Sequence, residues 1–392
     1  MSPDASVDFL IVGAGFSGLV AAERLSNAGF RCVVVDKRRH LGGNAYDRVD
    51  AAGVLVHDYG PHYFRTNSQR IVDYLGKFTE WQDADYKIRS YTGGRYWSFP
   101  INLHTFEEIV GHPATTEEFE AWIEEHRVPV DEPKNSEELI LSKVGRELYR
   151  RFYEGYTLKQ WQRHPRDLDA SVCGRVPIRT NRDDRYLNEE FQALPKDGFT
   201  AMFERMLDAS PRVELHLGVD FNEACQRWRH RHLIFTGPVD EYFKRRYGAL
   251  PYRSLSFEHE SFTSDQLKDR EPIAGKPGFW QPAVQVNYPD ANVPFTRIVE
   301  IKHVTGQKID ASTIIREYPR NWTPEEEPFY PVPANDAKTA YRRYAELAAA
   351  EENVSFIGRL ATYRYYNMDQ VTGMALAEAD RLIARYSPAP HA

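Results

Sequence analysis

The glycine-rich segment at residues 13–18 constrains the fold of this chain more than any other feature. It lies between an apolar run at residues 7–12 and a stretch at 16–28 with helical spacing, and a second apolar run at 32–35 ends in Asp36. This order predicts a strand, a tight turn, a helix and a second strand. Glycines let backbone N–H groups approach a pyrophosphate, and Asp36 can accept hydrogen bonds from a ribose. The segment therefore predicts a dinucleotide site, and the alternative is a tight turn without a ligand.

A basic run at residues 37–39 and a glycine pair at 42–43 follow directly. The glycine pair can pass close to a second phosphate, as in flavoproteins that hold FAD in an extended form, and this favours FAD over NAD. The alternative is a solvated basic hairpin. Near the C-terminus, Gly358 and Arg359 lie between an expected strand at 354–357 and an expected helix at 371–386, which predicts a second helix N-terminus at the flavin. The aromatic run at 363–366 fits this site or a core strand.

Length and composition indicate a folded protein of two or three domains. The chain has 392 residues, of which 42% are hydrophobic and 27% charged. A net charge of -7 provides no general attraction for nucleic acid or anionic lipid, so a bound anion must meet placed arginines. Cys32, Cys173 and Cys225 lack disulfide or zinc spacing, which favours a reducing cytoplasm. The most apolar stretch contains Glu23 and Arg24, so no membrane span or signal peptide is expected.

The rest of the chain predicts two further domains. Helical spacing at 116–127 and 136–153, the latter with Ser136 as N-cap, indicates an inserted helical domain. Short β-like runs at 213–217, 233–236, 283–288 and 296–301 predict strands, and an antiparallel sheet is expected among them. Residues 264–278 and 324–333 are expected as surface loops. The predicted FAD-binding domain comprises residues 1–80, 195–250 and 331–392, the helical domain residues 103–165, and the antiparallel-sheet substrate domain residues 81–102, 166–194 and 251–330.

Four separated blocks carry a resemblance to a known family. They are residues 60–66 (GPHYFRT), 155–161 (GYTLKQW), 290–297 (DANVPFTR) and 358–368 (GRLATYRYYNM). Their order and spacing resemble those of bacterial UDP-galactopyranose mutases along nearly the whole chain. The resemblance implies an α/β fold: a Rossmann-like extended-FAD-binding domain with an inserted helical domain and an antiparallel-sheet domain.

The same resemblance implies a flavoenzyme that acts as an isomerase. Its FAD would be bound noncovalently and active when reduced, with NADH or NADPH as possible reductants. The reaction would convert a UDP-sugar from pyranose to furanose, UDP-galactopyranose to UDP-galactofuranose or a close sugar nucleotide. Flavin N5 would attack the anomeric carbon, displace UDP and form a covalent adduct. A cytoplasmic homodimer in cell-wall or polysaccharide biosynthesis is expected, without nucleic-acid or membrane partners.

The resemblance also implies roles for individual residues. Arg175 and Arg297 are expected to hold the diphosphate, since a guanidinium bonds phosphate oxygens in pairs, and His62 and Arg65 complete the expected catalytic set. The expected substrate-binding residues are Asn102, Tyr156, Thr157, Trp161, Arg175, Tyr186, Arg297, Tyr330, Tyr365 and Asn367. The expected cofactor-binding residues are Gly13, Gly15, Phe16, Ser17, Gly18, Asp36, Lys37, Gly43, Asn44, Tyr63, Gly358, Arg359, Asn367 and Met368. A loop within 165–187 is expected to close over the substrate.

Three features depart from the family pattern and leave the substrate open. Arg65 stands where the family has a histidine next to the flavin, Asn367 stands where an acidic residue is frequent, and the loop at 264–278 is longer. An arginine stays charged at any working pH, so it would favour the anionic reduced flavin. A different sugar nucleotide, or a different use of the same flavin chemistry, therefore remains open.

Two other functions fit parts of the sequence. An FAD-dependent oxidoreductase of the amine-oxidase or protoporphyrinogen-oxidase type fits the glycine motifs, and a catalytically silent sugar-nucleotide-binding protein fits Arg65. Nothing in the sequence has the spacing of a Ser-His-Asp set, a metal-ligand cluster or a catalytic carboxylate pair. Neither a metal site nor acyl-transfer chemistry is expected.

Overall fold

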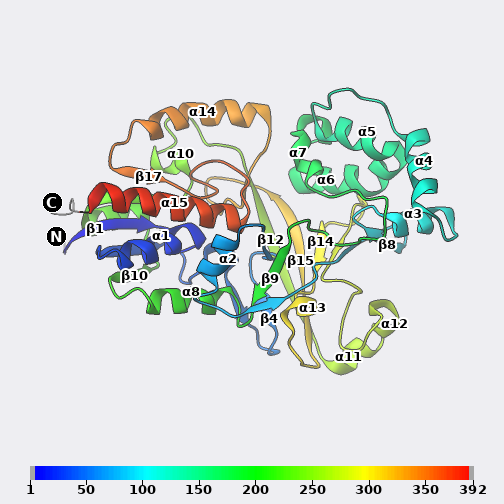
Figure 1. Cartoon of the computed structure of the whole chain (residues 1–392), viewed down its shortest axis with the longest axis horizontal. Helices are drawn as coiled ribbons and strands as arrows, with labels where there is room; N and C mark the ends of the chain where they lie inside the picture. The colour runs from blue at the N-terminus through cyan, green and yellow to red at the C-terminus, as the bar shows by residue number, and fades with distance from the viewer. Residues whose placement is uncertain (1–4, 388–392) are drawn as a thin grey trace.

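A five-stranded parallel sheet forms one end of the protein (Figure 1). The computed structural model describes residues 5–387. The strand order is β10 (Val213–Leu217), β2 (Cys32–Asp36), β1 (Ala5–Val12), β11 (Trp228–Phe235) and β17 (Val354–Phe356), and every pair is parallel. Successive residues Phe9, Leu10 and Ile11 are all fully buried. A strand buried on both faces needs no polar alternation, which explains the continuous apolar runs of the sequence.

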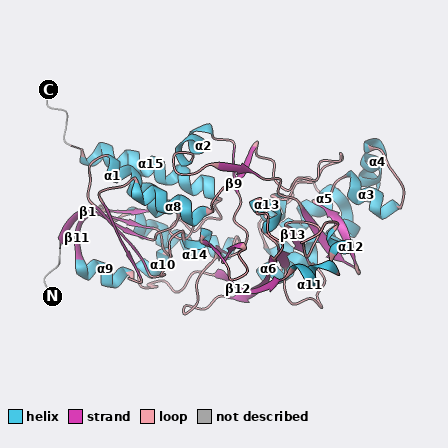
Figure 2. Cartoon of the chain, turned by 90° about the horizontal axis from the view of Figure 1, so that it is seen from below, coloured by secondary structure: helices cyan, strands magenta, loops and turns pink. Residues whose placement is uncertain are grey.

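Helices cover both faces of this sheet (Figure 2). On one face lie α1 (Phe16–Asn27), α8 (Phe199–Asp208) and α15 (Met368–Tyr386), and on the other lie α9 (Phe221–Arg227), α10 (Val239–Tyr242) and α14 (Asn335–Ala349). The predicted strand, turn, helix and strand at the N-terminus are confirmed. Helix α15 begins at Met368 rather than at residue 371, because Asn367 caps it through a reciprocal pair of hydrogen bonds with Gln370.

A seven-stranded, mainly antiparallel sheet occupies the middle of the chain. Its order is β16 (Tyr330–Pro331), β12 (Tyr252–Phe262), β15 (Ser312–Asn321), β14 (Arg297–Val299), β13 (Gln285–Asn287), β7 (Ile88–Thr92) and β8 (Arg95–Phe99). Only the β13–β7 pair in it is parallel. The register sets Arg297 opposite Glu317. The strands predicted at 283–288 and 296–301 belong here, whereas those at 213–217 and 233–236 lie in the parallel sheet.

A group of helices lies at the far end from both termini (Figure 1). It contains α3 (Leu103–Val110), α4 (Thr116–His126), α5 (Ser136–Leu148), a π-helical turn (Tyr149–Glu154), α6 (Gly155–Trp161), a 3-10 turn (Pro165–Asp167) and α7 (Ala170–Gly174). The single helix predicted at 136–153 is interrupted at Gly145, whose φ is +77°. Its N-cap is Asn135, which accepts from the Glu138 N–H, rather than the predicted Ser136.

The remaining elements connect these parts. They are β3 (Asp47–Val49) with β4 (Leu55–His57), β5 (Phe64–Thr66) with β9 (Phe191–Pro195) and β6 (Trp81–Asp83), and the helical segments η1 (Gly43–Ala45), α2 (Gln69–Leu75) and α13 (Lys302–Thr305).

Two segments differ from the expected loops. The stretch at 264–278 contains α11 (Ser264–Lys268), which a capping box at Thr263 starts, and α12 (Glu271–Ala274). The stretch at 324–333 contributes the edge strand β16. Residues 363–366 lie outside any strand. Within residues 5–387, no helix has the length and apolar character needed to cross a bilayer.

Candidate functional site

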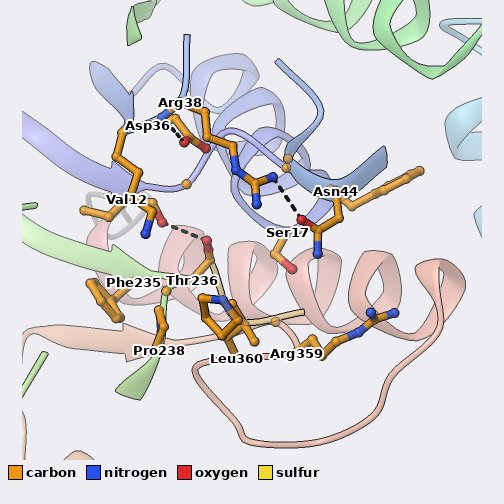
Figure 3. A pocket seen from close by; sticks show the side chains of 18 of the residues that line it. Val12, Ser17, Asp36, Arg38, Asn44, Phe235, Thr236, Pro238, Arg359 and Leu360 are labelled. Atoms are coloured by element: carbon orange, nitrogen blue, oxygen red, sulfur yellow. Dashed lines mark hydrogen bonds between the residues drawn. The ribbon is translucent and has the colours of Figure 1, made fainter. Parts of the chain in front are cut away.

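A cavity of about 390 Å³ opens at the carboxyl ends of β1, β2 and β11. This is the edge of a parallel sheet at which nucleotides bind in Rossmann-like folds. In Figure 3, Asp36, Arg38 and Asn44 lie across the cavity from Thr236, Pro238 and Leu360. The residues that line it include twelve of the expected cofactor-binding residues: Gly13, Gly15, Phe16, Ser17, Asp36, Lys37, Gly43, Asn44, Gly358, Arg359, Asn367 and Met368.

The glycines of the first turn keep two backbone segments in contact. Gly13 has a φ of +109°, and a side chain there would lie 2.0 Å from Oγ1 of Thr236 on the next strand. A Cβ at Gly18 would lie 1.9 Å from the Gly13 carbonyl, so Gly18 sets the packing of α1 on β1. Gly18 is therefore not among the residues that line the cavity, and its expected cofactor contact is replaced by this packing role.

Two backbone N–H groups fix the carboxylate of Asp36. One carboxylate oxygen accepts from the Ala14 N–H at 2.8 Å and the other from the Arg38 N–H at 2.9 Å. Each oxygen keeps a lone pair that can accept from a ribose hydroxyl.

Arg38, which follows strand β2, contacts the connecting segment at residues 324–333. Its guanidinium donates to Oδ1 of Asn44 at 2.9 Å and to Oε2 of Glu327 at 3.3 Å, and it lies 4.4 Å from the ring centre of Tyr59. Glu327 also pairs with Lys37 at 2.9 Å. Glu327 lines the cavity, so a connection that leads to β16 closes one wall of the cofactor site. The basic run stands out in the sequence, but Glu327 does not, because the two partners are 289 residues apart.

His62 lines the cavity and presents a hydrogen-bond acceptor. Its Nδ1 lies 2.9 Å from the carbonyl of Gly60, which can only accept, so we assign the ring proton to Nδ1 and the lone pair to Nε2. Burial lowers the pKa of His62 to about 3, and the neighbouring His57 contributes. His57 accepts from the His62 N–H through Nδ1 at 3.0 Å. The ring of His62 is therefore neutral at physiological pH.

Tyrosines and arginines from distant segments gather next to the cavity. Tyr330 and Tyr365 have ring centres 5.2 Å apart, and Trp161 lies 6.0 Å from Tyr365. The guanidinium of Arg175 lies 4.0 Å over the Tyr365 ring. Arg359, which also lines the cavity, lies 5.4 Å from the Tyr330 ring. This aromatic–arginine cluster is thus continuous with the cofactor cavity.

Tyr156 and Tyr186 belong to the same cluster. Burial raises the pKa of both hydroxyls, while Arg297 opposes the rise at each and Arg175 opposes it at Tyr186. Burial raises the pKa of Tyr330 to about 12, with Tyr365 adding to the rise. All these hydroxyls are therefore protonated at neutral pH and can donate to an anion.

Arg297 is held in place by a buried carboxylate. Its Nε donates to Oε2 of Glu317 at 2.7 Å, and Nη1 lies 3.4 Å from Oε1 of Gln285. The Glu317 side chain is 0% exposed. Burial lowers the pKa of Arg297, but Glu317 together with the neighbouring tyrosine hydroxyls raises that pKa well above its usual value, so the guanidinium stays charged. Tyr86 donates to the same Gln285 oxygen at 2.7 Å.

Helix α6 is fixed to the turn that precedes β14. The ammonium of Lys159 donates to the carbonyls of Asp290, Val293 and Phe295 at 2.9–3.1 Å, and also to that of Tyr288. A side chain at Gly155 would lie 2.3 Å from the Pro289 carbonyl. The helix that bears Tyr156 and Trp161 therefore packs directly on the turn that leads to Arg297.

Three further residues expected at the site have buried side chains. Asn102 is completely buried as the N-cap of α3: Oδ1 accepts from the His104 and Thr105 N–H groups, and Nδ2 donates to Ser98 and to the Pro100 carbonyl. Its amide therefore has no group left for uridine, which corrects the expectation.

The other two lie in the interior. The hydroxyl of Thr157 is 3.5 Å from Sγ of Cys173, so this side chain contacts the interior of the helical group. Tyr63 is 9% exposed, its ring packs on Tyr86 at 4.8 Å, and it is not among the residues that line the cavity.

Arg65 lies on β5, beside rather than in the cavity lining. Its Nη1 is 3.3 Å from Oε2 of Glu189. The expected position against the flavin is thus replaced by an ion pair with the segment that carries Tyr186.

Sequence reasoning missed Glu317, Gln285, Tyr86 and Glu327. Each reaches the site only through strand register or long-range packing, and none stands in a recognisable local motif. Within the described part of the chain, no group of three His, Cys, Asp or Glu side chains could hold a metal ion.

Comparisons with known proteins agree on one family. Residues 151–365 match the family described as UDP-galactopyranose mutase, and residues 11–78 match the NAD(P)-binding Rossmann-like domain. A Klebsiella pneumoniae protein described as "Probable UDP-galactopyranose mutase" is 35% identical over 96% of this chain and 95% of its own length. The dTDP-fucopyranose mutase of Escherichia coli is 34% identical over 92% of this chain and 94% of its own.

A solved structure supports the fold. Reduced UDP-galactopyranose mutase superposes with a TM-score of 0.72 at 16% identity, covering 98% of this chain and 97% of the other. The predicted architecture, a Rossmann-like α/β part combined with further helices and an antiparallel sheet, is confirmed.

Proposed function

Because this chain belongs to the UDP-galactopyranose mutase family, we propose that it interconverts the pyranose and furanose rings of a sugar nucleotide. The observation that carries this proposal is the aromatic–arginine cluster beside the cofactor cavity, in which Arg175 lies over the ring of Tyr365 and Glu317 holds Arg297 in place. A reaction that expels a nucleoside diphosphate needs cations at the leaving group. In a chain of net charge -7, these two arginines supply that charge locally.

The cofactor proposed for the cavity is FAD. The backbone N–H groups at Gly13 and Gly15 and the start of α1 suit the pyrophosphate, and Asp36 suits the adenosine ribose. Arg359, Met368 and the start of α15 lie at the other end, where the isoalloxazine would sit. When bound and reduced, FAD would provide a nucleophilic N5 for chemistry at the anomeric carbon, and the residues named here would hold it there. NADH or NADPH is the proposed reductant.

The diphosphate would lie between the two arginines. Arg297 is orientated by Glu317 and Gln285, so its position is fixed before substrate arrives. Arg175 is exposed and directly follows α7, so it belongs to a different segment of the chain from Arg297. The protonated hydroxyls of Tyr186 and Tyr330 add neutral donors, and Tyr365 lies beside Tyr330.

The nucleoside and the sugar would contact different walls. Tyr156 and Trp161 of α6 provide aromatic surface for the base, and Thr157 remains in the proposed substrate set only through its backbone. Asn367 and the Nε2 acceptor of His62 line the cavity where the sugar hydroxyls would meet the flavin.

The names of the relatives support two candidate sugar nucleotides. UDP-galactopyranose is the first candidate, and dTDP-fucopyranose is the second because a relative of nearly equal identity carries that name. Asn367 can donate as well as accept, so it can pair with hydroxyl patterns that a carboxylate cannot.

The test is anaerobic turnover of both sugar nucleotides by the FAD-loaded protein after reduction with dithionite. Products are separated by chromatography and their ring size is assigned by NMR. A furanose product from either substrate, absent with the oxidised protein, is the expected result. Binding of both nucleotides without any furanose product would exclude the mutase and leave a silent binding protein. Substrate-driven flavin bleaching that oxygen reverses would instead support an amine-oxidase-type reaction.

A matched pair of variants tests the arginine that carries the proposal. Arg297→Met should abolish most turnover and weaken UDP binding, because it removes the placed cation. Arg316→Met is the control, since Arg316 lies on the neighbouring strand and pairs with Glu258 and Glu260 away from the site. The homodimer and the cytoplasmic location stay predictions, to be checked by ultracentrifugation and cell fractionation.

A further inference from the structure

Arg65 is joined to the segment that follows Arg175. Its guanidinium lies 3.3 Å from the carboxylate of Glu189, and both side chains are largely shielded, at 22% and 25% exposure. On the paired strands β5 and β9, Arg65 stands opposite Gln192. The ion pair therefore links the centre of one strand to the turn that enters the other.

The charge of Arg65 acts on two other groups. It opposes the burial that raises the pKa of Tyr186, and it also opposes the burial that raises the pKa of Asp369. Oδ1 of Asp369 is buried and has no hydrogen-bond partner within the described residues. Arg65 thus lies where β5, the turn at 187–190 and the start of α15 meet.

The segment at 175–190 is stiffened from within. The guanidinium of Arg179 donates to the carbonyls of Asp183, Arg185 and Leu187 and to Oδ1 of Asn188. One side chain therefore holds the second half of this segment as a unit. The position of this half on the protein therefore depends on contacts at Asp184, which pairs with Lys87 and Arg89, and at Glu189.

This unit is held to the rest of the protein at several points, among them Asp184, which pairs with Lys87 at 3.0 Å and with Arg89 at 3.5 Å. The Tyr186 N–H donates to the carbonyl of Tyr86 at 3.2 Å, and Nε2 of Gln192 donates to the carbonyl of Glu189 at 2.7 Å. Both use backbone groups of the segment. The Arg65–Glu189 pair is a further charged contact of the segment, besides those that Asp184 makes with Lys87 and Arg89, and it lies at the end that leads into β9.

We infer that Arg65 is a positioning residue, which clasps Glu189 and so holds Tyr186 toward the diphosphate between Arg175 and Arg297. This inference rests on the proposed function for its diphosphate, but the clasp itself does not. A histidine at position 65 is shorter and neutral above its pKa, so it would lose both the reach and the permanent charge needed for this contact. Arg65 therefore orients the segment at 175–190 rather than contacting the flavin.

The size of the effect follows from the exposure of the pair. Partly exposed ion pairs contribute at most about 1 kcal/mol, which corresponds to about a fivefold change in an equilibrium. Loss of the clasp should therefore loosen the segment about two- to fivefold without unfolding the protein. The exposed arginines Arg182 and Arg185, at 53% and 54%, provide trypsin sites within the segment that report this loosening.

The experiment compares tryptic cleavage of the FAD-loaded proteins at Arg182 and Arg185, followed by mass spectrometry, together with UDP affinity by calorimetry. Arg65→Met and Glu189→Gln should each speed cleavage and weaken UDP binding about two- to fivefold, and the double variant should add nothing further. Arg65→Lys should restore part of both effects. Arg70→Met is the control, because Arg70 pairs with Asp380 outside this segment.

Two results would overturn the clasp. One is unchanged cleavage in Glu189→Gln, or effects of the two single variants that add in the double variant. The other is a changed flavin spectrum or midpoint potential in Arg65→Met with unchanged cleavage, which would place Arg65 on the flavin. Failure of the proposed function has a different signature: the wild-type protein would not bind UDP, while the cleavage rates would still decide whether the clasp exists.

Discussion

Arg297 and Glu317 stand directly opposite each other on β14 and β15 and share a hydrogen bond of 2.7 Å between Nε and Oε2. The other carboxylate oxygen, Oε1, is buried without a hydrogen-bond partner in the described residues. A Cβ atom at Gly60 would lie 2.9 Å from this oxygen. The position of the main proposed diphosphate ligand therefore depends on a strand register and on a glycine far away in the sequence.

Replacing Glu317 should cost both stability and activity. Removing one partner of a buried ion pair costs about 3–5 kcal/mol, because the other charge is left buried alone. Glu317→Gln keeps the shape and should lower kcat/KM about a hundredfold, as Arg297 loses its fixed orientation. Thermal unfolding and turnover measured together check this. Unchanged kcat/KM in a folded Glu317→Gln protein would show that Arg297 does not depend on this carboxylate.

Gly60 should be sensitive to a single methyl group. Gly60→Ala adds a Cβ against Oε1 of Glu317 at a φ of +87°, a conformation that costs a non-glycine residue about 1–2 kcal/mol. The expected result is weaker UDP binding beyond the loss of stability, because Glu317 must move. Gly53→Ala is the matched control, with a φ of +82° and open space around the added carbon. Equal UDP affinity in the two variants would contradict the prediction.

The Arg38–Glu327 pair should stabilise the bound cofactor. Arg38→Met and Glu327→Gln should each weaken FAD retention several-fold, because the connection at 324–329 no longer closes its wall of the cavity. The double variant should resemble the single ones if the pair acts together. FAD release in rising salt, followed by fluorescence, measures this. Additive losses would mean that the two side chains act on FAD separately.

His57 should make the protein less stable in mild acid. The side chain is 2% exposed, and burial lowers its pKa to about 4. The unfolded chain takes up the proton below about pH 6.5 and the folded one does not, so stability is full above pH 6.5 and falls by about 1.4 kcal/mol per pH unit down to pH 4. In His57→Asn, whose oxygen can still accept from the His62 N–H, this part of the slope should disappear. Chemical denaturation at pH 7, 6 and 5 measures it.

Asn102 should matter for folding and not for nucleotide recognition. Asn102→Ala removes the cap of α3 and leaves two N–H groups buried, at a cost of about 1–3 kcal/mol. UDP affinity of the folded variant should stay within twofold of the wild-type value. A tenfold loss of UDP affinity with unchanged stability would instead support the predicted contact between Asn102 and uridine.

The parts of the site that lie in local motifs could be predicted from the sequence. The glycine turn, Asp36 and the start of α15 are set by neighbouring residues, and these line the cavity as expected. Asn102 is expected to contact uridine only because of its position in the family pattern. An asparagine before a helix is equally suited to cap that helix, as Asn102 does here.

The parts that depend on tertiary structure could not be predicted. Glu317 faces Arg297 through the register of two strands, and Glu327 meets Arg38 across 289 residues. The spacing that predicted one helix at 136–153 gave no sign of its interruption, since the outcome depends on Gly145 packing against the carbonyl of His126.

The carbonyls around Lys159 form a coordination shell of the kind that loops usually build for a dissolved potassium or sodium ion. Here the cation is covalently attached to α6. The turn at 288–295 is therefore held by a charge that belongs to the chain rather than by a dissolved ion, and burial lowers the pKa of this ammonium to about 8. Because the same helix carries Tyr156 and Trp161, one side chain joins the proposed base-binding wall to the turn that leads to Arg297.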